Sequence, residues 1–361
     1  YKNLINDVQI GTSILVNDGL IELKVEKIDD TDIVCRVING GIISDRKAIN
    51  VPGVHLSLPF LSDVDRRDLE FAMKTGFDFF ALSFVRCAED VLEVRRLQKE
   101  HNNTSKLIAK IESQEGVENL DAIIDVADGI MVARGDMGVE IPFEKVPVVQ
   151  KDMISKCLKS GKFVIVATQM LESMTHNPRP TRAEVNDVAN AIFDQTSAVM
   201  LSGESAAGDY PVEAVKTMSR ICHEIEKTTT TGKFEITYNG SNLASSIACA
   251  ACSIASVINA DAIIPVSLSG STIRKVSGFR PNINIIGCST NECVCRETSL
   301  MWGVTPVLIT EQADGEALIN EVISKCKTAG VIKSGNRVVI VAGFPLRIAG
   351  ATNMIRVVDV E

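Results

Sequence analysis

The first fifty or so residues alternate between apolar and polar positions in short runs. These runs occupy 12–28 and 32–40, and the turn signals are Asn17-Asp18-Gly19 and Asn39-Gly40-Gly41. A period of two, broken by asparagine and glycine, is typical of strands joined as hairpins. The pattern therefore predicts a small antiparallel β unit over 7–54.

After residue 55 the pattern changes to continuous apolar runs, each followed by an amphipathic segment. Strands without alternation are buried on both faces, as in a parallel sheet covered by helices. The repeat resembles the roughly 30 residues that each unit of a (β/α)8 barrel occupies. Five units are either an open sheet or part of a barrel whose other three units lie upstream of Tyr1. The predicted strands are 79–84, 106–112, 129–136, 163–169 and 198–204.

A Thr-rich stretch at 227–235 precedes a second α/β block. Its small-residue segment at 242–258 predicts a long helix, and apolar runs predict the strands that follow. We therefore expect a separate C-terminal α/β domain. Its predicted strands are 262–267, 284–289, 305–310 and 337–343.

The size and charge of the chain narrow the choice of partners. With 361 residues it exceeds the usual single domain, so two or three compact units are expected. The formal net charge of −9 argues against a nucleic-acid surface. The apolar runs are far shorter than the roughly 20 residues needed to span a bilayer, so no membrane partner is expected either.

Ten cysteines are scattered singly through apolar segments, which favours reduced thiols and a cytoplasmic protein. The one C-x-x-C, Cys249 and Cys252, lies in an Ala-rich helical stretch and is interpreted as core packing. The start of the chain has neither a Met nor a charged-then-apolar leader, so we expect a piece of a longer protein.

Polar residues gather at the carboxyl ends of the predicted parallel strands, where barrel enzymes place their chemistry. Glu112 and Asp136 end neighbouring strands and can offer two hard oxygen ligands to a Mg²⁺ ion. Lys110 lies two residues before Glu112, so both side chains face the same side of the strand. A cation beside a metal suits stabilisation of a transferring phosphoryl group or an enolate.

Two further residues fit the same rim. Gly135 has no Cβ, so backbone N–H groups there can approach an anion closely. Thr168 ends the next strand and offers a hydroxyl to a carboxylate oxygen or to a proton path. Any one of these residues alone would fit a solvated strand end or a helix cap equally well. Several together at matching strand ends favour a site.

Four stretches, 106–142, 164–174, 177–194 and 198–215, resemble the pyruvate kinase family, and the likeness runs through essentially the whole chain. The resemblance implies an α/β fold: a partial TIM (β/α)8 barrel with an inserted small β-barrel domain and a C-terminal α/β domain. It implies three domains: the later part of domain B at 1–54, barrel strands four to eight of domain A at 55–228, and domain C at 229–361, for effector binding and oligomerisation. The first three barrel strands and the start of domain B would then lie upstream.

By the same resemblance, Lys110 contacts the transferring phosphoryl and enolate oxygens, and Glu112 and Asp136 bind the Mg²⁺ or Mn²⁺ ion. The backbone at Gly135 and Asp136 and the Thr168 hydroxyl would hold the carboxylate of phosphoenolpyruvate or pyruvate. Thr168 is also implicated in protonating the enolate.

The resemblance also implies the reaction, which is the glycolytic transfer of a phosphoryl group from phosphoenolpyruvate to ADP, giving pyruvate and ATP. Arg134 is interpreted as structural, orienting nearby loops. A K⁺ ion is implied, with ligands outside this chain. A homotetramer and a sugar-phosphate effector are further implied.

The effector would bind at a serine-rich turn between a predicted strand and helix. Such a turn presents N–H groups and hydroxyls to a phosphate, although an ordinary βα turn looks much the same. The residues of this candidate phosphate loop are Ser267, Ser269, Gly270, Ser271 and Thr272.

The sequence departs from the family pattern at three positions. Val64 replaces a lysine thought to help nucleotide binding, which puts ADP affinity in question. Gln195 and Ser197 replace the usual Gly and Asp, which predicts a different backbone before the last strand. His176 lies in a loop beside Asn177 and Pro178, and no catalytic role is expected for it.

Two other functions stay open at this point. One is a Mg²⁺-dependent aldolase or lyase barrel acting on an α-keto acid, which needs no nucleotide. The other is a non-catalytic fragment. Since the phosphate and K⁺ groups of the family would lie upstream, we expect the 361-residue chain alone to be inactive.

Overall fold

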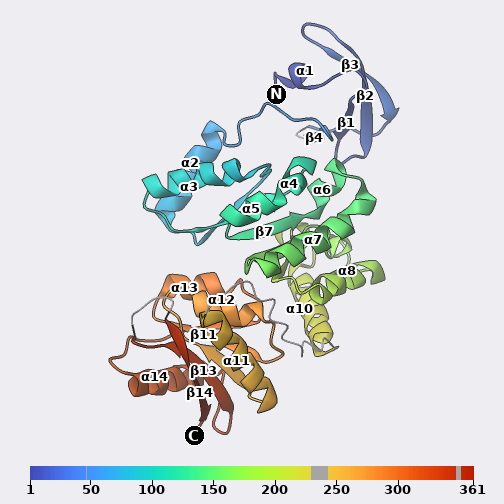
Figure 1. Cartoon of the computed structure of the whole chain (residues 1–361). Helices are drawn as coiled ribbons and strands as arrows, with labels where there is room; N and C mark the ends of the chain where they lie inside the picture. The colour runs from blue at the N-terminus through green and yellow to red at the C-terminus, as the bar shows by residue number, and fades with distance from the viewer. Residues whose placement is uncertain (46, 229–242, 347–350) are drawn as a thin grey trace. The chain divides into compact units, whose positions relative to one another are not determined.

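The computed structural model describes residues 1–45, 47–228, 243–346 and 351–361, so most of the predicted Thr-rich linker lies outside the described residues. The chain forms two compact units (Figure 1). The first contains Tyr1–Asp187 and Val199–Lys216, and the second contains Val188–Ala198 and Thr217–Glu361. Each unit is described by itself.

The first unit begins with a small antiparallel sheet, as the alternating pattern predicts. A short helix α1 (Leu4–Asp7) precedes four strands in the order β3-β2-β1-β4. Apolar side chains on one face of this sheet form a small core around Ile14, Val25 and Val51. The strands are β1 (Ser13–Val16), β2 (Ile21–Ile28), β3 (Ile33–Asn39) and β4 (Ile49–Asn50).

A five-stranded sheet follows, in which the strands lie in sequence order, β5-β6-β7-β8-β9. The pairs from β5 to β8 are parallel. All five residues of β7, the middle strand of the sheet, are buried. The predicted parallel α/β arrangement of this block is therefore confirmed. The strands are β5 (Phe79–Leu82), β6 (Lys106–Ile111), β7 (Gly129–Ala133), β8 (Phe163–Ala167) and β9 (Ala198–Met200).

The helices around this sheet begin and end at residues that suit those positions. Ser62 and Asp65 form a capping box at the start of α2, and Gly76 ends it in the left-handed region. The long helices are α2 (Asp63–Thr75), α3 (Ala88–Glu100), α7 (Val146–Lys159), α8 (Arg182–Phe193) and α10 (Pro211–Thr228). The short ones are α4 (Gln114–Glu118), α5 (Leu120–Val126), α6 (Arg134–Glu140), η1 (Phe143–Lys145), η2 (Glu172–Thr175) and α9 (Gly203–Ala206).

The amino-terminal ends of β7 and β8 meet at Gly129 and Phe163, which are paired in the sheet. A Cβ added to Gly129 would lie 2.2 Å from the Phe163 ring. That ring also packs edge-on against Phe79, with the two ring centroids 5.9 Å apart. Because residue 129 has no side chain, there is room for the aromatic pair of Phe79 and Phe163.

The predicted strand ends need correction. The strand predicted over 129–136 ends at Ala133, and Arg134 is already the first residue of α6. The run predicted over 163–169 ends at Ala167, because Thr168 and Gln169 both have positive φ angles, 68° and 53°. Polar residues thus follow the strands as turns and helix starts.

The second unit contains a five-stranded sheet in the order β12-β11-β10-β13-β14. Four strands are parallel, which agrees with the predicted α/β domain, while β14 pairs antiparallel with β13 and was not predicted. The strands are β10 (Ala262–Pro265), β11 (Asn284–Ser289), β12 (Val304–Leu308), β13 (Arg337–Gly343) and β14 (Thr352–Asp359). The helices are α11 (Leu243–Val257), α12 (Ser271–Gly278), α13 (Glu292–Thr298) and α14 (Gly315–Thr328).

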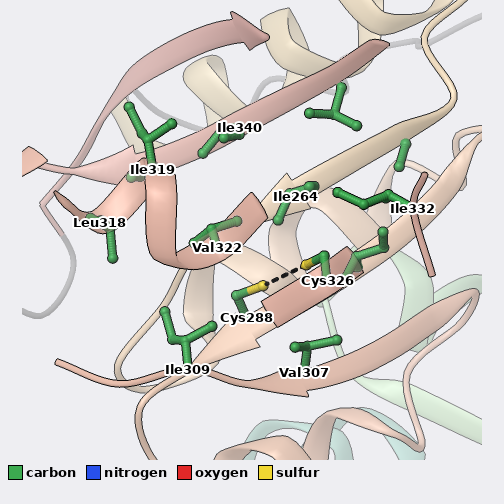
Figure 2. Packing of buried hydrophobic residues seen from close by; sticks show 14 of the residues in the cluster. Ile264, Cys288, Val307, Ile309, Leu318, Ile319, Val322, Cys326, Ile332 and Ile340 are labelled. Carbon is green, nitrogen blue, oxygen red and sulfur yellow. Dashed lines mark hydrogen bonds between the residues drawn. The ribbon is translucent and has the colours of Figure 1, made fainter. Parts of the chain in front are cut away.

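Successive residues of β10 enter opposite cores, which is why its sequence is apolar throughout. Ile263 packs under α11 and α12, and Ile264 packs under α14. Figure 2 shows the α14 side, where Cys288 of β11 and Cys326 of α14 approach with their sulfur atoms 3.7 Å apart.

All ten cysteines of the chain are free thiols. Cys249 and Cys252 are buried on α11, which confirms their interpretation as core residues. Burial raises the pKa of Cys252 to about 12, so that thiol stays protonated at neutral pH. No helix within the described ranges is long and apolar enough to cross a membrane.

The residues before β9 pack on Arg280 within the second unit. Gln195 has a φ of 66°, which lies in the left-handed region that a glycine adopts without strain. The Arg280 guanidinium donates to the Gln195 carbonyl oxygen at 3.3 Å and to the Ser197 hydroxyl at 3.1 Å. Arg280 also lies over the ring of Trp302, and burial lowers its pKa to about 10.

Candidate active site

Lys110 and Glu112 lie at the carboxyl end of β6 and form an ion pair. The Lys110 Nζ is 2.8 Å from the Glu112 Oε1. The same ammonium donates a hydrogen bond to the Ser83 Oγ at 2.7 Å, just after β5. The predicted same-side orientation of the two charged residues is thus observed, and Ser83 fixes the ammonium from the neighbouring strand.

Glu112 is 1% exposed, and both of its oxygens have partners. Its Oε2 accepts a hydrogen bond from the Phe84 N–H at 2.5 Å. Burial is the main cause that raises the pKa of Glu112; Lys110 and the Phe84 N–H act in the opposite direction, and the charge of Asp136 raises the pKa further. Asp136 and Glu112 therefore interact electrostatically, as a shared cation site requires.

Asp136 lies in the first turn of α6, and its charge also acts on Glu140, one turn further along. Burial is the largest cause that raises the pKa of Glu140, and Asp136 adds to it. Among the described residues the Asp136 carboxylate has no hydrogen-bond partner, so its oxygens are available to a ligand.

A cavity of about 1220 Å³ within the first unit is lined by Asp136 and Glu140. Ser83 and Phe84, which contact Lys110 and Glu112, line it as well. Asp136, Glu140 and the two residues that contact Lys110 and Glu112 thus line one space large enough for a small substrate and a hydrated cation, whereas Lys110 and Glu112 are not among its lining residues.

Thr168 is held in its left-handed conformation by residues at the start of α6. Its Oγ1 accepts a hydrogen bond from the Gly135 N–H at 2.8 Å and donates one to the Ala167 carbonyl oxygen at 2.6 Å. A positive φ is an outlier for a β-branched residue. The Gly135 N–H predicted to meet an anion is therefore engaged with the Thr168 hydroxyl in this structure.

Arg134 is the second restraint on Thr168. Its Nη2 donates to the Thr168 carbonyl oxygen at 2.6 Å, and its Nη1 lies 2.5 Å from the Asp187 carboxylate on α8. The Arg134 side chain is only 10% exposed. These contacts support the interpretation that it orients the loop after β8.

The site suits a divalent cation on the chemistry of its donors. Glu112, Asp136 and Glu140 bring three carboxyl groups, and the Lys110 ammonium is paired with Glu112. Carboxylate oxygens are the ligands that Mg²⁺ prefers, and it keeps further positions for water and substrate. Within the described ranges no group of three or more His, Cys, Asp and Glu side chains has the geometry of a complete metal site. Two protein carboxylates are what the sequence predicts.

Sequence reasoning missed Ser83, Phe84 and Glu140. Ser83 and Phe84 belong to the run predicted as the strand over 79–84, and the structure ends that strand at Leu82, where Phe84 adopts a φ of 54°. Glu140 could have been found by its spacing, because it lies four residues after Asp136 on what proves to be a helix.

The predicted phosphate loop lies between β10 and α12 in the second unit. Gly270 has a φ of 75° and precedes the first turn of α12. The Thr272 N–H lies 3.4 Å from the Ser267 Oγ, and the Thr272 hydroxyl is bonded to that of Thr352 at 2.7 Å. Ser267, Ser269 and Thr272 line a small cavity of about 70 Å³.

The other two singled-out residues lie on the surface. Val64 is an exposed residue of the first turn of α2. The His176 Nδ1 lies 3.2 Å from the Asp209 carboxylate at an exposed position.

Comparison with known proteins identifies the family. Its sequence model described as "Pyruvate kinase, barrel domain" matches residues 1–215, and that described as "Pyruvate kinase, alpha/beta domain" matches 245–358. A "Pyruvate kinase" of Clostridium acetobutylicum is 46% identical over 365 residues, covering 100% of this chain and 77% of that protein. Those of two Staphylococcus aureus strains are also 46% identical, over 362 residues.

The match to the Staphylococcus aureus relatives covers 99% of this chain but only 62% of their length. These matches cover both structural units, and they do not favour the aldolase or lyase alternative. The fold, a TIM-like barrel portion with a C-terminal α/β domain, agrees with the two family models. The chain belongs to the pyruvate kinase family.

Proposed function

We propose that the protein transfers a phosphoryl group from phosphoenolpyruvate to ADP, giving pyruvate and ATP. The observation that supports this most directly is the grouping of Lys110, Glu112 and Asp136 at the ends of β6 and β7 in a member of this family. An ammonium beside two carboxylates suits a reaction in which negative charge moves between phosphoryl and enolate oxygens.

Lys110 is proposed to meet the transferring phosphoryl group and then the enolate oxygen. Its ammonium is already held between Ser83 and Glu112, so little reorganisation accompanies the charge transfer. Glu112 and Asp136 would hold a Mg²⁺ or Mn²⁺ ion, which supplies Lewis-acid stabilisation of the phosphoryl and carboxylate oxygens when bound.

Thr168 is proposed to bind the substrate carboxylate and to carry a proton toward the enolate carbon. Its hydroxyl is oriented by the Gly135 N–H, and its backbone by Arg134. The backbone at Gly135 and Asp136 is proposed as the rest of the carboxylate site. Accepting a substrate there requires the Thr168 hydroxyl to share or give up the Gly135 N–H.

Several wider properties are proposed from the family likeness. They are a K⁺ requirement with ligands outside this chain, a homotetramer, and a sugar-phosphate effector at Ser267, Ser269, Gly270, Ser271 and Thr272. The proposed domains are B at 1–54, A at 55–228 and C at 229–361. Ten free thiols support a reducing, cytoplasmic location.

The test is a coupled assay of pyruvate formation from phosphoenolpyruvate and ADP. The protein is expressed from the start of its own gene and, in parallel, as the 361-residue chain, for which negligible turnover is expected. Lys110→Met should lower kcat at least about a hundredfold, because a transition-state charge contact is lost.

The matched control removes a charge away from the site. Glu144→Gln, at an exposed position of η1, should leave kcat within twofold, whereas Glu112→Gln should lower it and raise the Mg²⁺ concentration needed for half activity. Normal turnover of Lys110→Met, or cleavage of a hydroxy-keto acid without ADP, would contradict the proposal.

A further inference from the structure

We propose that Glu204 is a positioning residue for Thr168, because it fixes the strained turn after β8 from the far side of that turn. The inference rests on the proposed function, in which the Thr168 hydroxyl meets the substrate carboxylate and the enolate. Glu204 is 0% exposed, so it acts through the turn and does not touch a substrate itself.

The turn after β8 contains two consecutive residues in the left-handed region, and neither is a glycine. Strand β8 ends at Ala167, and Thr168 and Gln169 follow with φ angles of 68° and 53°. Such conformations persist only where the surrounding structure holds them in place. The contacts on either side of this turn therefore decide where the Thr168 hydroxyl lies.

The start of α6 holds the near side of the turn. The Arg134 Nη2 donates to the Thr168 carbonyl oxygen at 2.6 Å, and the Gly135 N–H donates to the Thr168 Oγ1 at 2.8 Å. The same Arg134 nitrogen lies 2.7 Å from the Met170 sulfur, which is a weak acceptor. Along the backbone of the described residues, these bonds from α6 reach no further than Thr168.

Glu204 holds the far side of the turn. It belongs to α9, which follows β9, the strand next to β8 in the sheet. Its Oε1 accepts a hydrogen bond from the Leu171 N–H at 2.9 Å, and its Oε2 accepts one from the Ser202 N–H at 2.8 Å. One buried carboxylate thus joins the segments that follow two neighbouring strands.

Glu204 is itself held by close packing of α9 on η2. A Cβ built on Gly208 would lie 2.6 Å from the Glu204 carbonyl oxygen and 3.2 Å from the Thr175 Cα. The Asp209 N–H also donates to the Thr175 carbonyl oxygen at 2.8 Å. Because the backbone around Glu204 is fixed in this way, its carboxylate can restrain Leu171.

A carboxylate suits this position better than an amide does. Both of its oxygens accept, whereas a glutamine has one accepting oxygen and would present its NH₂ group to the other backbone N–H. Glu204→Gln should therefore leave one buried N–H without an acceptor and loosen the turn. A shift of about 1 Å in a catalytic group can cost about a hundredfold in rate, so we expect kcat to fall about ten- to a hundredfold.

The experiment is a double-mutant cycle of Glu204→Gln and Thr168→Ala in the protein expressed from the start of its own gene. Two rates are measured: pyruvate formation, and exchange of the pyruvate methyl protons with solvent deuterium, which reports the proton step in reverse. Glu204→Gln should lower both rates about tenfold or more when Thr168 is present, and less than twofold in the Thr168→Ala background. The KM for ADP should change less than twofold.

Asp128→Asn is the matched control for a loss of stability. Asp128 also accepts a backbone hydrogen bond, from the Leu107 N–H at 2.8 Å, but it directly precedes β7 at the amino-terminal end of that strand. This variant should lower the melting temperature and leave kcat within twofold. Glu204→Asp keeps a carboxylate on a shorter side chain and replaces Glu204→Gln if that variant does not fold; its smaller loss of kcat should also require Thr168.

The outcomes separate the inference from the proposed function. Normal kcat in Glu204→Gln would overturn the inference, and so would an equal loss with and without the Thr168 hydroxyl, which indicates general destabilisation. If Thr168→Ala is slow and Glu204→Gln is normal, the inference alone is wrong and the proposed role of Thr168 stands. If Thr168→Ala turns over normally, that role and the inference are both wrong.

Discussion

Single residues in the left-handed region mark the positions where the backbone turns sharply after or before a strand. Thr168 is held there by a hydrogen bond from the Arg134 side chain to its carbonyl oxygen. Gln195 is held there by Arg280, whose guanidinium donates to the Gln195 carbonyl oxygen. Gln195 therefore holds a left-handed conformation that a glycine would adopt without strain.

The strain at Gln195 gives a residue-scale prediction. Gln195→Gly should raise the free energy of unfolding by about 0.5–1 kcal/mol, because it removes roughly 1–2 kcal/mol of left-handed strain and adds less than that in unfolded-state entropy. Urea denaturation measures the change. Gln312→Gly is the matched control: Gln312 is not left-handed, so stability should fall. A loss of stability in Gln195→Gly would contradict this account.

At the scale of helices and strands, the sequence predicted which elements exist and whether each is a helix or a strand, but it did not predict the residues at which they end. Periodicity revealed the antiparallel strands β1 to β3 and eight of the parallel strands, because burial on one or both faces leaves a clear pattern. It missed β14, in which only Thr352 is buried and the other residues are half-buried or exposed, so neither a continuous apolar run nor a strict alternation marks it. It also extended β7 into α6, since α6 begins at Arg134 directly after Ala133 and no loop separates the strand from the helix.

The candidate active site likewise contains residues that the sequence could predict and residues that it could not. Lys110, Glu112 and Asp136 could be predicted because charges at the ends of apolar strands are conspicuous. Their partners Ser83 and Phe84 could not, because these contacts join segments distant in sequence through a turn whose conformation is set by packing. The identity of a hydrogen-bond partner depends on register and rotamer, which periodicity does not contain.

The start of α8 gives an element-scale prediction about pH. Glu184 accepts hydrogen bonds from the backbone N–H and hydroxyl groups of Ser173 and Thr181 at 2.6–2.9 Å. Burial raises its pKa, but these bonds outweigh burial and the pKa is lowered overall. A depressed carboxyl pKa stabilises the fold above the unfolded-state pKa, and that stability is lost as pH falls through the folded-state value.

Glu184→Gln should therefore lower the melting temperature at pH 7 and have progressively less effect as the pH falls below about 4, the ordinary Glu range. Calorimetry at both pH values tests this. Glu144→Gln, at an exposed position, should change the melting temperature little at either pH. An equal deficit of Glu184→Gln at both pH values would show that the charge of Glu184 is not responsible.

At the scale of the whole molecule, the two compact units each have their own buried core. A cavity created by substitution in one core should therefore destabilise that unit. Trp302 is the only tryptophan of the chain, and it packs against the core under α11 in the second unit. Its fluorescence should therefore report unfolding of that unit, whereas circular dichroism reports both.

Ile264→Ala should lower the denaturant midpoint of Trp302 fluorescence, because it opens a cavity beneath α14 that costs about 2–5 kcal/mol. Ile130→Ala opens an equivalent cavity in β7 of the first unit. It should change the circular dichroism transition and leave the fluorescence midpoint in place. If both variants move the fluorescence midpoint equally, the units unfold as one.

The Phe163 ring lies over the bare backbone of Gly129, so the residue types at positions 129 and 163 depend on each other. Any β-carbon at that glycine would displace Phe163, and the displaced ring would lose its edge-on neighbour Phe79. An alanine at residue 129 fits only if residue 163 is smaller than phenylalanine. A smaller residue 163 beside Gly129 would in turn leave a void. Homologous chains should therefore keep the small and bulky partners together, or exchange them together.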